Sequence, residues 1–385
     1  MNFKTHLTLA VSGLVSSLML VACGGSGLNA IPTAANWPPV PTLIAHRGAS
    51  ALRPEHTLAS YAQAIDDGAD IIEPDLVSTK DGVLVARHEN AIAILNADGT
   101  VREATTDIVD RPEFASRKAT KTIDGSAITG WFTEDLTLAE LKTLRARERI
   151  PAIRPANAAF NGQFQVPTLQ EVIDLAKSKS IEKGRTIGIY PETKHPTYFK
   201  SIGLPLEKRL IDVLALNGWN NRDAPVFIQS FEVANLKELR GLTTVRITQL
   251  LFSAGRPYDF VAAGASETRL YADLITPAGL KEIATYANGI GPSKDLVIPV
   301  VNGALGTPTA LVTNAKAAGL VTHIYTLRPE NAFLPASLKT APTTDNTVRG
   351  NSIAEIQTFL QAGVDGFFTD DSAVGRAAIQ TFVKK

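Results

Sequence analysis

The stretch "GADIIEPDLVSTKDGVLVARHEN", residues 68–90, decides the fold. Its first half, 70–77, is an apolar run typical of a buried strand, yet it carries Glu73 and Asp75. Residues two apart in a strand share a face, so both carboxylates point the same way. Like charges repel more strongly when they lose solvent, and a bound cation would relieve that repulsion. The alternative is a solvated strand end with salt-bridge partners.

Runs of this kind recur along the chain and alternate with amphipathic helical segments. Two of these helices begin with apparent capping boxes, Thr168–Glu171 and Ser352–Glu355. Strand–helix alternation predicts a parallel sheet, and about eight units predict an α/β fold of the TIM (β/α)8 barrel type. One barrel needs one strand fewer than the sequence offers, and 296–301 fits least well. The candidate strands are 42–46, 70–77, 83–88, 186–193, 225–231, 246–252, 296–301, 321–327 and 365–369.

The barrel is expected to be irregular after its second strand. Only "STKDG" separates 70–77 from 83–88, and a parallel crossover needs a dozen or more residues. Either the barrel is distorted there, or the two segments form a hairpin.

A segment without regular periodicity interrupts the alternation at 91–165. We interpret it as an insertion of about 75 residues at the C-terminal face, where the loops of such barrels carry function. One helix is expected inside it, started by the capping box Thr137–Glu140. The catalytic barrel would then comprise 42–90 and 166–385.

The N-terminus has the features of a bacterial lipoprotein signal. A lysine and a long apolar run end in "LVACGG", which resembles a lipobox, and Cys23 is the only cysteine of the chain. We expect a signal peptide over 1–22, lipidation of Cys23 and a Gly- and Pro-rich flexible tether over 23–41. The alternative is an ordinary signal peptide with an incidental cysteine. A lipid anchor on Cys23 predicts a location in the bacterial cell envelope, with the outer membrane, facing the periplasm or the surface, expected.

The composition excludes one class of partner. The 385 residues carry 38 basic and 38 acidic side chains, so the chain has no net charge to attract nucleic acid. The sequence does not predict an oligomeric state.

A second strand, "TIGIYPETKHP", repeats the arrangement of the first, with Glu192 and Lys194 two apart. Glu192 would complete a three-carboxylate site with Glu73 and Asp75. Oxygen ligands suit a hard divalent cation, Ca²⁺ or Mg²⁺, rather than zinc. Lys194 adds a positive charge beside that site.

Histidines follow two of the predicted strands. His46 and Arg47 end the run "LIA", and His88 ends "VLVAR". Two histidines at the strand ends suit general acid–base catalysis near neutral pH. With a cation, Arg47 and Lys194 nearby, the site predicts phosphoester chemistry. We expect His56 to position its loop, His323 to be structural, and His195 to point away from Lys194.

At these residues the chain resembles the glycerophosphodiester phosphodiesterase family, in its bacterial periplasmic and lipoprotein branch. The matching motifs are "HRGAS…RPEHT", "GADIIEPDLVSTKDGVLVARHE", "IGIYPETKHP", "FIQSFE", "IYTLRPEN" and "GVDGFFTD". They run in order from 44 to 371, nearly the whole mature chain. Glu89 departs from the aspartate common in the family, which puts the orientation of His88 in question.

The resemblance implies a TIM barrel that binds one Ca²⁺ or Mg²⁺, with Ca²⁺ favoured. It implies hydrolysis of small glycerophosphodiesters, the deacylated phospholipids, to sn-glycerol 3-phosphate and an alcohol. The implied roles are metal ligation by Glu73, Asp75 and Glu192; acid–base catalysis by His46 and His88; phosphate contact by Arg47 and Lys194; and lining of the pocket by Gln229, Phe231 and Tyr325.

Two other functions remain open at this stage. A phospholipase acting on lysophospholipid or phosphoinositide would need an apolar rim, for which "ITGWF", 128–132, is the only hint. A non-catalytic lipoprotein that binds surface partners is disfavoured because the carboxylates and both histidines are intact.

Overall fold

The computed structural model describes residues 1–2 and 37–383. The predicted signal peptide, Cys23 and most of the predicted tether lie outside the described residues. Within residues 37–383, no helix combines the length and apolarity needed to cross a membrane.

Eight parallel strands form a closed barrel. Two of them are each broken by a proline: Pro74 separates β2 from β3, and Pro191 lies in the break between β9 and β10. Each half keeps its neighbour, since β2 pairs with β9 and β3 pairs with β10. The chain of pairings ends where it began, with β17 on β1, so the predicted (β/α)8 barrel is confirmed. The barrel strands are β1 (Thr42–His46), β2 (Ile71–Glu73), β3 (Asp75–Ser78), β9 (Gly188–Ile189), β10 (Glu192–Thr193), β11 (Phe227–Ser230), β12 (Arg246–Leu251), β13 (Gly289–Pro292), β16 (Val321–Leu327) and β17 (Gly366–Thr369).

Helices link these strands. They are α1 (Leu58–Asp66), α3 (Leu169–Lys183), α4 (Pro196–Ser201), α5 (Glu207–Leu216), α6 (Val233–Leu242), α7 (Tyr258–Ala262), α8 (Tyr271–Leu274), α9 (Pro277–Ile283), α10 (Lys294–Val297), α11 (Leu311–Ala317), α12 (Ser352–Gln361) and α13 (Ser372–Val383). Thr168 forms the predicted capping box of α3. The box at Ser352 is wrong: Asn351 caps α12, and Glu355 bonds Lys294 instead.

One predicted strand is wrong and one barrel strand was missed. Residues 296–301 contribute the end of α10 and β14 (Val300–Val301), which pairs with β15 (Ala304–Leu305) as an exposed hairpin. The barrel strand is instead β13, whose sequence "GIGP" is typical of a turn. Both glycines are there because space is short: a Cβ on Gly289 would lie 2.6 Å from Val321 Cγ2, and one on Gly291 2.5 Å from Leu250 Cδ2.

The short link after the second strand is a hairpin, the second of the two alternatives. β4 (Leu84–Ala86) pairs antiparallel with β3 and is not a barrel strand. The hairpin returns the chain to the level of Asp75, since Arg87 N–H donates to Asp75 O at 2.9 Å. His88 therefore reaches the barrel mouth from this hairpin.

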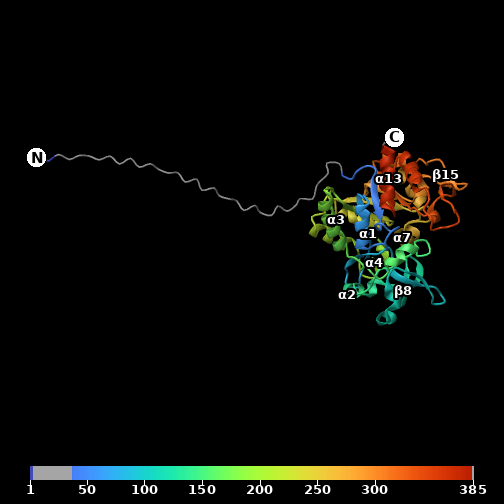
Figure 1. The fold of residues 1–385 in the computed structure, drawn as a ribbon, viewed down its shortest axis with the longest axis horizontal. Helices are drawn as coiled ribbons and strands as arrows, with labels where there is room; N and C mark the ends of the chain where they lie inside the picture. The colour runs from blue at the N-terminus through green and yellow to red at the C-terminus, as the bar shows by residue number, and fades with distance from the viewer. Residues whose placement is uncertain (3–36, 384–385) are drawn as a thin grey trace. The chain divides into compact units, whose positions relative to one another are not determined.

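The insertion contains an antiparallel sheet that the sequence did not predict. Its order is β6-β5-β8-β7, formed by β5 (Ala91–Leu95), β6 (Val101–Ala104), β7 (Ala119–Ile123) and β8 (Ser126–Phe132). The expected helix is present as α2 (Leu138–Leu141), with the capping box at Thr137. In Figure 1 β8 and α2 lie together, apart from α13.

Aromatic rings fill the interior of the barrel. Tyr190 stacks on Phe227 with centroids 4.9 Å apart, and Phe368 packs edge-on to Tyr190 at 5.1 Å. The Tyr190 hydroxyl lies 2.6 Å from Thr248 Oγ1 and 3.1 Å from His323 Nδ1. Trp37 packs against Phe227 at 5.9 Å. This aromatic floor is a packed core, as such barrels require.

Candidate active site

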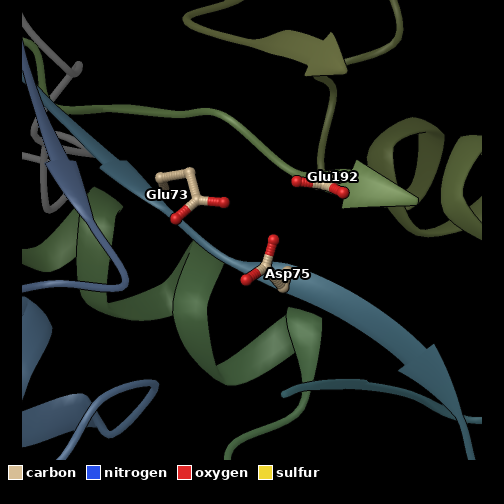
Figure 2. A group of neighbouring side chains, drawn as sticks. All are labelled: Glu73, Asp75 and Glu192. Atoms are coloured by element: carbon tan, nitrogen blue, oxygen red, sulfur yellow. The ribbon is translucent and has the colours of Figure 1, made fainter. Parts of the chain in front are cut away.

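Three buried carboxylates converge where two barrel strands are broken. Glu73 ends β2, Asp75 begins β3 and Glu192 begins β10, and one oxygen of each lies within 4.8 Å of the others (Figure 2). The register makes this possible, because Glu192 pairs directly with Asp75 across the sheet. The sequence prediction that these three residues meet is confirmed in position.

Burial makes this carboxylate cluster costly without a cation. Burial and the charges of Asp75 and Glu192 raise the pKa of Glu73 well above its usual value. Burial, with Asp75 beside it, raises the pKa of Glu192 to about 8. Burial would also raise the pKa of Asp75, but His56, Lys194 and Arg47 hold it well below its usual value. Burial therefore disfavours three negative charges in this cluster, and a divalent ion would compensate them.

The donor set fits a hard cation. All three side chains offer oxygen, the ligand that Ca²⁺ and Mg²⁺ prefer. Gln229 adds a fourth polar group, since its Nε2 donates to Glu73 Oε1 at 3.2 Å. Its buried Oε1 has no hydrogen-bond partner within residues 37–383. This unpaired amide oxygen is a further potential ligand beside the three carboxylates.

The turn after β1 brings His46 and Arg47 to the cluster. Arg47 has φ 60°, a left-handed conformation uncommon for a side-chain-bearing residue, and its N–H donates to Glu73 Oε2 at 2.8 Å. Gly48 follows with φ 88°, and a Cβ there would lie 2.4 Å from Ser60 Oγ. The turn therefore requires glycine at position 48, whereas Arg47 adopts a conformation that its side chain disfavours.

Asp370 orients His46. Its Oδ1 lies 2.6 Å from His46 Nδ1, and both groups are buried. Burial opposes ionisation of Asp370, but Arg154 and Arg328 hold its pKa well below the usual value. An ionised carboxylate only accepts, so Nδ1 carries the hydrogen and Nε2 keeps a free lone pair. Burial and Arg47 lower the pKa of His46 to about 4, so His46 is neutral at pH 7.

His88 is the more exposed of the two predicted catalytic histidines. Its Nδ1 is 3.1 Å from Glu89 Oε1, and 28% of its side chain is exposed. Burial, Arg47 and Lys194 hold its pKa well below the usual value, whereas Glu89 raises it. A bound phosphate would screen the two cations and so favour protonated His88.

The cations of the site face both the carboxylates and the open cleft. Lys194 Nζ lies 3.0 Å from Glu192 Oε1, and this pairing raises the pKa of Lys194 against the effect of burial. Arg47 bonds Glu55, and its Nε lies 3.5 Å from Asp75 Oδ2. Both side chains stay charged at any pH of interest.

A cleft of about 700 Å³ joins these groups. Phe231 lies at the centre of an aromatic wall, with Tyr325 at 5.9 Å, Phe252 at 6.3 Å and Tyr271 at 6.4 Å between ring centroids. The cleft is lined by all ten predicted barrel-site residues, whose roles stay predictions: His46, Arg47, Glu73, Asp75, His88, Glu192, Lys194, Gln229, Phe231 and Tyr325.

Of the two remaining histidines, His323 is structural as expected, whereas His56 contacts a carboxylate of the cluster and does more than position its loop. His56 is fully buried, with Nε2 2.9 Å from Asp75 Oδ2 and Nδ1 2.7 Å from the Tyr61 hydroxyl, so it orients Asp75. His323 is part of the aromatic floor, where burial lowers its pKa to about 4.

The expectation that His195 points away from Lys194 is wrong, since both residues line the same cleft. His195 lines the cleft, because the chain turns at φ 48° directly after Lys194. Its Nε2 lies 2.7 Å from Glu89 Oε2 and its Nδ1 2.6 Å from Asp124 Oδ2. Burial opposes a charge, yet these two bonds raise the pKa of His195 to about 9. Asp124 belongs to the β7–β8 turn, so protonated His195 ties the insertion to the barrel.

This bridge predicts a pH-dependent stability. The pKa of His195 in the folded protein, about 9, exceeds the usual 6.5. The bridge therefore contributes its full amount to the free energy of unfolding below pH 6.5, and this contribution is lost as the pH rises through 9. The shift corresponds to on the order of 3 kcal/mol. Chemical unfolding of wild type and His195→Gln should show a gap in unfolding free energy that narrows by about this amount between pH 6 and pH 10. A gap independent of pH would contradict a charged bridge.

Sequence reasoning missed the partners of the histidines. Asp370 and Asp124 contact His46 and His195, and two arginines of the insertion, Arg149 and Arg154, contact Glu55 and Asp370. Each of these pairs is separated by more than 70 positions along the chain. Asp370 stands in the quoted motif "GVDGFFTD", which was the available signal. The insertion residues lie in a segment with no periodicity, which offered none.

Comparison with known proteins gives a consistent result. A profile of the "Glycerophosphoryl diester phosphodiesterase family" matches residues 46–374. A "Glycerophosphodiester phosphodiesterase GDPD6" of Arabidopsis thaliana is 35% identical over 389 residues, which cover 96% of this chain and 95% of that protein.

Solved structures with the same fold are more distant in sequence. One is a putative glycerophosphoryl diester phosphodiesterase of Silicibacter pomeroyi, with a TM-score of 0.57, 20% identity and coverage of 89% of this chain and 95% of the other. Another is a phosphodiesterase of Oleispira antarctica in complex with the product sn-glycerol-3-phosphate, with a TM-score of 0.52, 19% identity and coverage of 89% and 97%. At these identities the likeness establishes the TIM-barrel fold.

Proposed function

The chain belongs to the glycerophosphoryl diester phosphodiesterase family, and from this premise we propose that it hydrolyses glycerophosphodiesters to sn-glycerol 3-phosphate and an alcohol. The observation that carries the proposal is one cleft that joins three buried carboxylates, two cations and two histidines. The complex of the Oleispira antarctica protein with sn-glycerol-3-phosphate supports the product.

We propose that Glu73, Asp75 and Glu192 hold one divalent cation, Ca²⁺ or Mg²⁺. When bound, such an ion draws electron density from phosphate oxygens and neutralises charge that develops on them. Arg47 and Lys194 bind the same phosphate from the protein side. Their charge complements the phosphodiester anion and holds it between the two histidines.

In this mechanism the two histidines move the protons. His46 Nε2 has a free lone pair and takes a proton from the attacking water. As the new P–O bond forms, the P–O bond to the leaving alcohol breaks, and His88 gives that oxygen a proton. Glu89 supports the protonated form of His88, and its extra methylene relative to aspartate still reaches Nδ1.

Product release tests the proposal directly. We expect purified protein to release choline from glycerophosphocholine and ethanolamine from glycerophosphoethanolamine, with sn-glycerol 3-phosphate as the common product. Prolonged dialysis against a chelator should abolish both reactions, and added Ca²⁺ or Mg²⁺ should restore them. Absence of turnover with either ion would contradict the function, whereas full activity in excess chelator would contradict the metal.

The alternatives lose support. The apolar segment 128–132 forms no rim, because Trp131 and Phe132 are buried and Trp131 Nε1 donates to Phe114 O at 2.8 Å. The feature that would favour a phospholipase is therefore missing from that segment. The complete set of site residues in one cleft also argues against a non-catalytic binding protein.

We further propose that the mature chain is anchored to the bacterial envelope, with the outer membrane expected, through lipid on Cys23. Several acyl chains together hold a protein firmly at a membrane. Cys23→Ser should therefore move the protein from the membrane pellet to the supernatant after cell fractionation. Complete retention of the variant in the membrane fraction would be incompatible with this anchor.

A further inference from the structure

Residues 148–157 of the insertion lie against the residues that hold His46 and Arg47. Two arginines of this segment bond carboxylates of the barrel. Arg149 Nε donates to both oxygens of Glu55 at 3.0 Å, and Arg154 Nη2 donates to Asp370 Oδ2 at 2.5 Å. Neither carboxylate is a ligand of the proposed cation.

Arg154 reaches His46 through a single carboxylate. Asp370 divides its oxygens: Oδ1 lies 2.6 Å from His46 Nδ1, whereas Oδ2 accepts from Arg154 Nη2 and lies 3.1 Å from Arg328 Nε. His46, Asp370 and Arg154 are all buried. The remaining nitrogens of Arg154 are also occupied: Nε donates to Glu330 Oε1 at 2.7 Å and Nη1 to Ser50 O at 2.9 Å. This planar fork fixes Asp370 in one orientation, as an arginine can and a lysine cannot.

The same guanidinium also supports the backbone behind His46. Ser50 accepts from Arg154 through its carbonyl, and its hydroxyl donates to His46 O at 3.0 Å. Arg154 therefore contacts the turn after β1 at two points, one through Asp370 and one through Ser50.

Arg149 makes the parallel connection to the phosphate-binding arginine. Glu55 accepts from Arg47 Nη1 at 3.1 and 3.3 Å while it accepts from Arg149. Burial opposes the charge on Glu55, yet the two arginines hold its pKa well below the usual value. Glu55 thus stays ionised and keeps Arg47 turned toward the cluster, where Nε lies 3.5 Å from Asp75 Oδ2.

We propose that segment 148–157 belongs to the catalytic apparatus: Arg154 is a positioning residue for His46, acting through Asp370, and Arg149 is one for Arg47, acting through Glu55. The assignment rests on the proposed function, since it takes His46 and Arg47 as the groups that act on substrate. A displacement of about 1 Å in a reacting group costs on the order of 10²-fold in rate, which sets the scale of the effect.

A merely structural role would have different consequences. Ion pairs that only fastened the insertion would affect the amount of folded protein and leave the turnover of the folded fraction intact. The positioning roles instead predict a different kinetic effect for each arginine. Loss of Arg154 disorders the base, which lowers kcat, whereas loss of Arg149 loosens the phosphate contact, which raises KM.

The test compares Arg154→Met, Arg154→Lys and Arg149→Met on glycerophosphocholine, with rates corrected for folded protein. We expect Arg154→Met to lower kcat by about 30- to 100-fold with KM within about threefold of wild type. Arg154→Lys should recover part of kcat, since it returns a charge to Asp370. Arg149→Met should raise KM by about tenfold with a smaller change in kcat. The matched control is Arg147→Met, which removes a surface pair with Asp110 and should leave both parameters unchanged.

A second readout does not depend on turnover. Nitrogen-15 NMR of histidine should show His46 as the Nδ1–H tautomer in wild type, and as a tautomer mixture in Arg154→Met. Kinetic parameters of folded Arg154→Met within twofold of wild type, or an unchanged His46 tautomer, would overturn the assignment. Inactive wild-type protein would contradict the proposed function alone, because the tautomer would still report on Arg154.

Discussion

Replacing Glu73 by glutamine is expected to lower kcat/KM for glycerophosphocholine by on the order of 10³-fold or more, with little recovery at high Ca²⁺ or Mg²⁺. Glutamine keeps the shape of the side chain and removes one of three charged oxygens from the cluster. It would also turn an amide nitrogen toward a group that now donates to Glu73, either Arg47 N–H or Gln229 Nε2. Both effects weaken the hold on a cation.

The fold should survive this substitution. The pKa of Glu73 is raised well above its usual value, so without an ion the carboxyl is already largely uncharged, and glutamine resembles that form. Glu207→Gln is the matched control, because Glu207 is equally buried but bonds Asn235 away from the cleft. Added Ca²⁺ or Mg²⁺ should raise the thermal midpoint of wild type and of the control, but not that of Glu73→Gln. A variant with wild-type activity, or with an intact thermal response to the ion, would remove Glu73 from the metal site.

The second large effect separates the two histidines by their leaving groups. An alkoxide leaves poorly without a proton, so losing the acid should cost on the order of 10²–10⁴-fold on glycerophosphocholine. A nitrophenolate leaves well unprotonated, so the acid variant should recover on a nitrophenyl phosphodiester and the base variant should not. We expect His88→Ala to recover and His46→Ala to stay impaired on both substrates.

The structure supports this division of roles. His46 has Nδ1 committed to ionised Asp370 and a pKa of about 4, as a base needs at neutral pH. His88 lies beside Glu89 and is partly exposed, where it can take up a proton once phosphate screens Arg47 and Lys194. The measurement is kcat/KM of both variants on both substrates. Selective recovery of His46→Ala would reverse the roles, and equal losses on both substrates would leave no division between them.

The barrel could be predicted because its strands are short apolar runs between turn residues, a local signal. β13 escaped prediction because close strand packing selects glycine at 289 and 291, and glycine is typical of turns. The sheet of the insertion was not predicted because its strands are loosely covered rather than tightly packed. Strands such as β6 and β7 are largely exposed, so their sequences lack the apolar alternation that burial imposes.

The site was predictable only where a side chain follows directly from a strand. Glu73, Asp75, Glu192 and His46 stand at strand ends, and the topology brings strand ends together. Asp370 and Arg154 act on His46 from 324 and 108 positions away along the chain. Such contacts depend on how loops of different units fold back, which no local pattern encodes. His195 was predicted wrongly because strand alternation was extended one residue beyond the strand, into a turn with positive φ.

The aromatic floor has a consequence for the order in which the products leave the cleft. Tyr190, Phe227 and Phe368 pack against one another in the barrel interior, and Phe368 also lines the cleft, so the substrate and both products would pass through the open side of the cleft. The freed alcohol carries no anionic group that Arg47 and Lys194 could hold, and choline or ethanolamine is itself a cation that both side chains repel, whereas sn-glycerol 3-phosphate keeps its anionic group between them. The alcohol would therefore leave first. The sn-glycerol 3-phosphate would remain in the phosphate-binding site that the next substrate needs. The turnover rate would then depend on how quickly sn-glycerol 3-phosphate is removed from the compartment in which the protein acts.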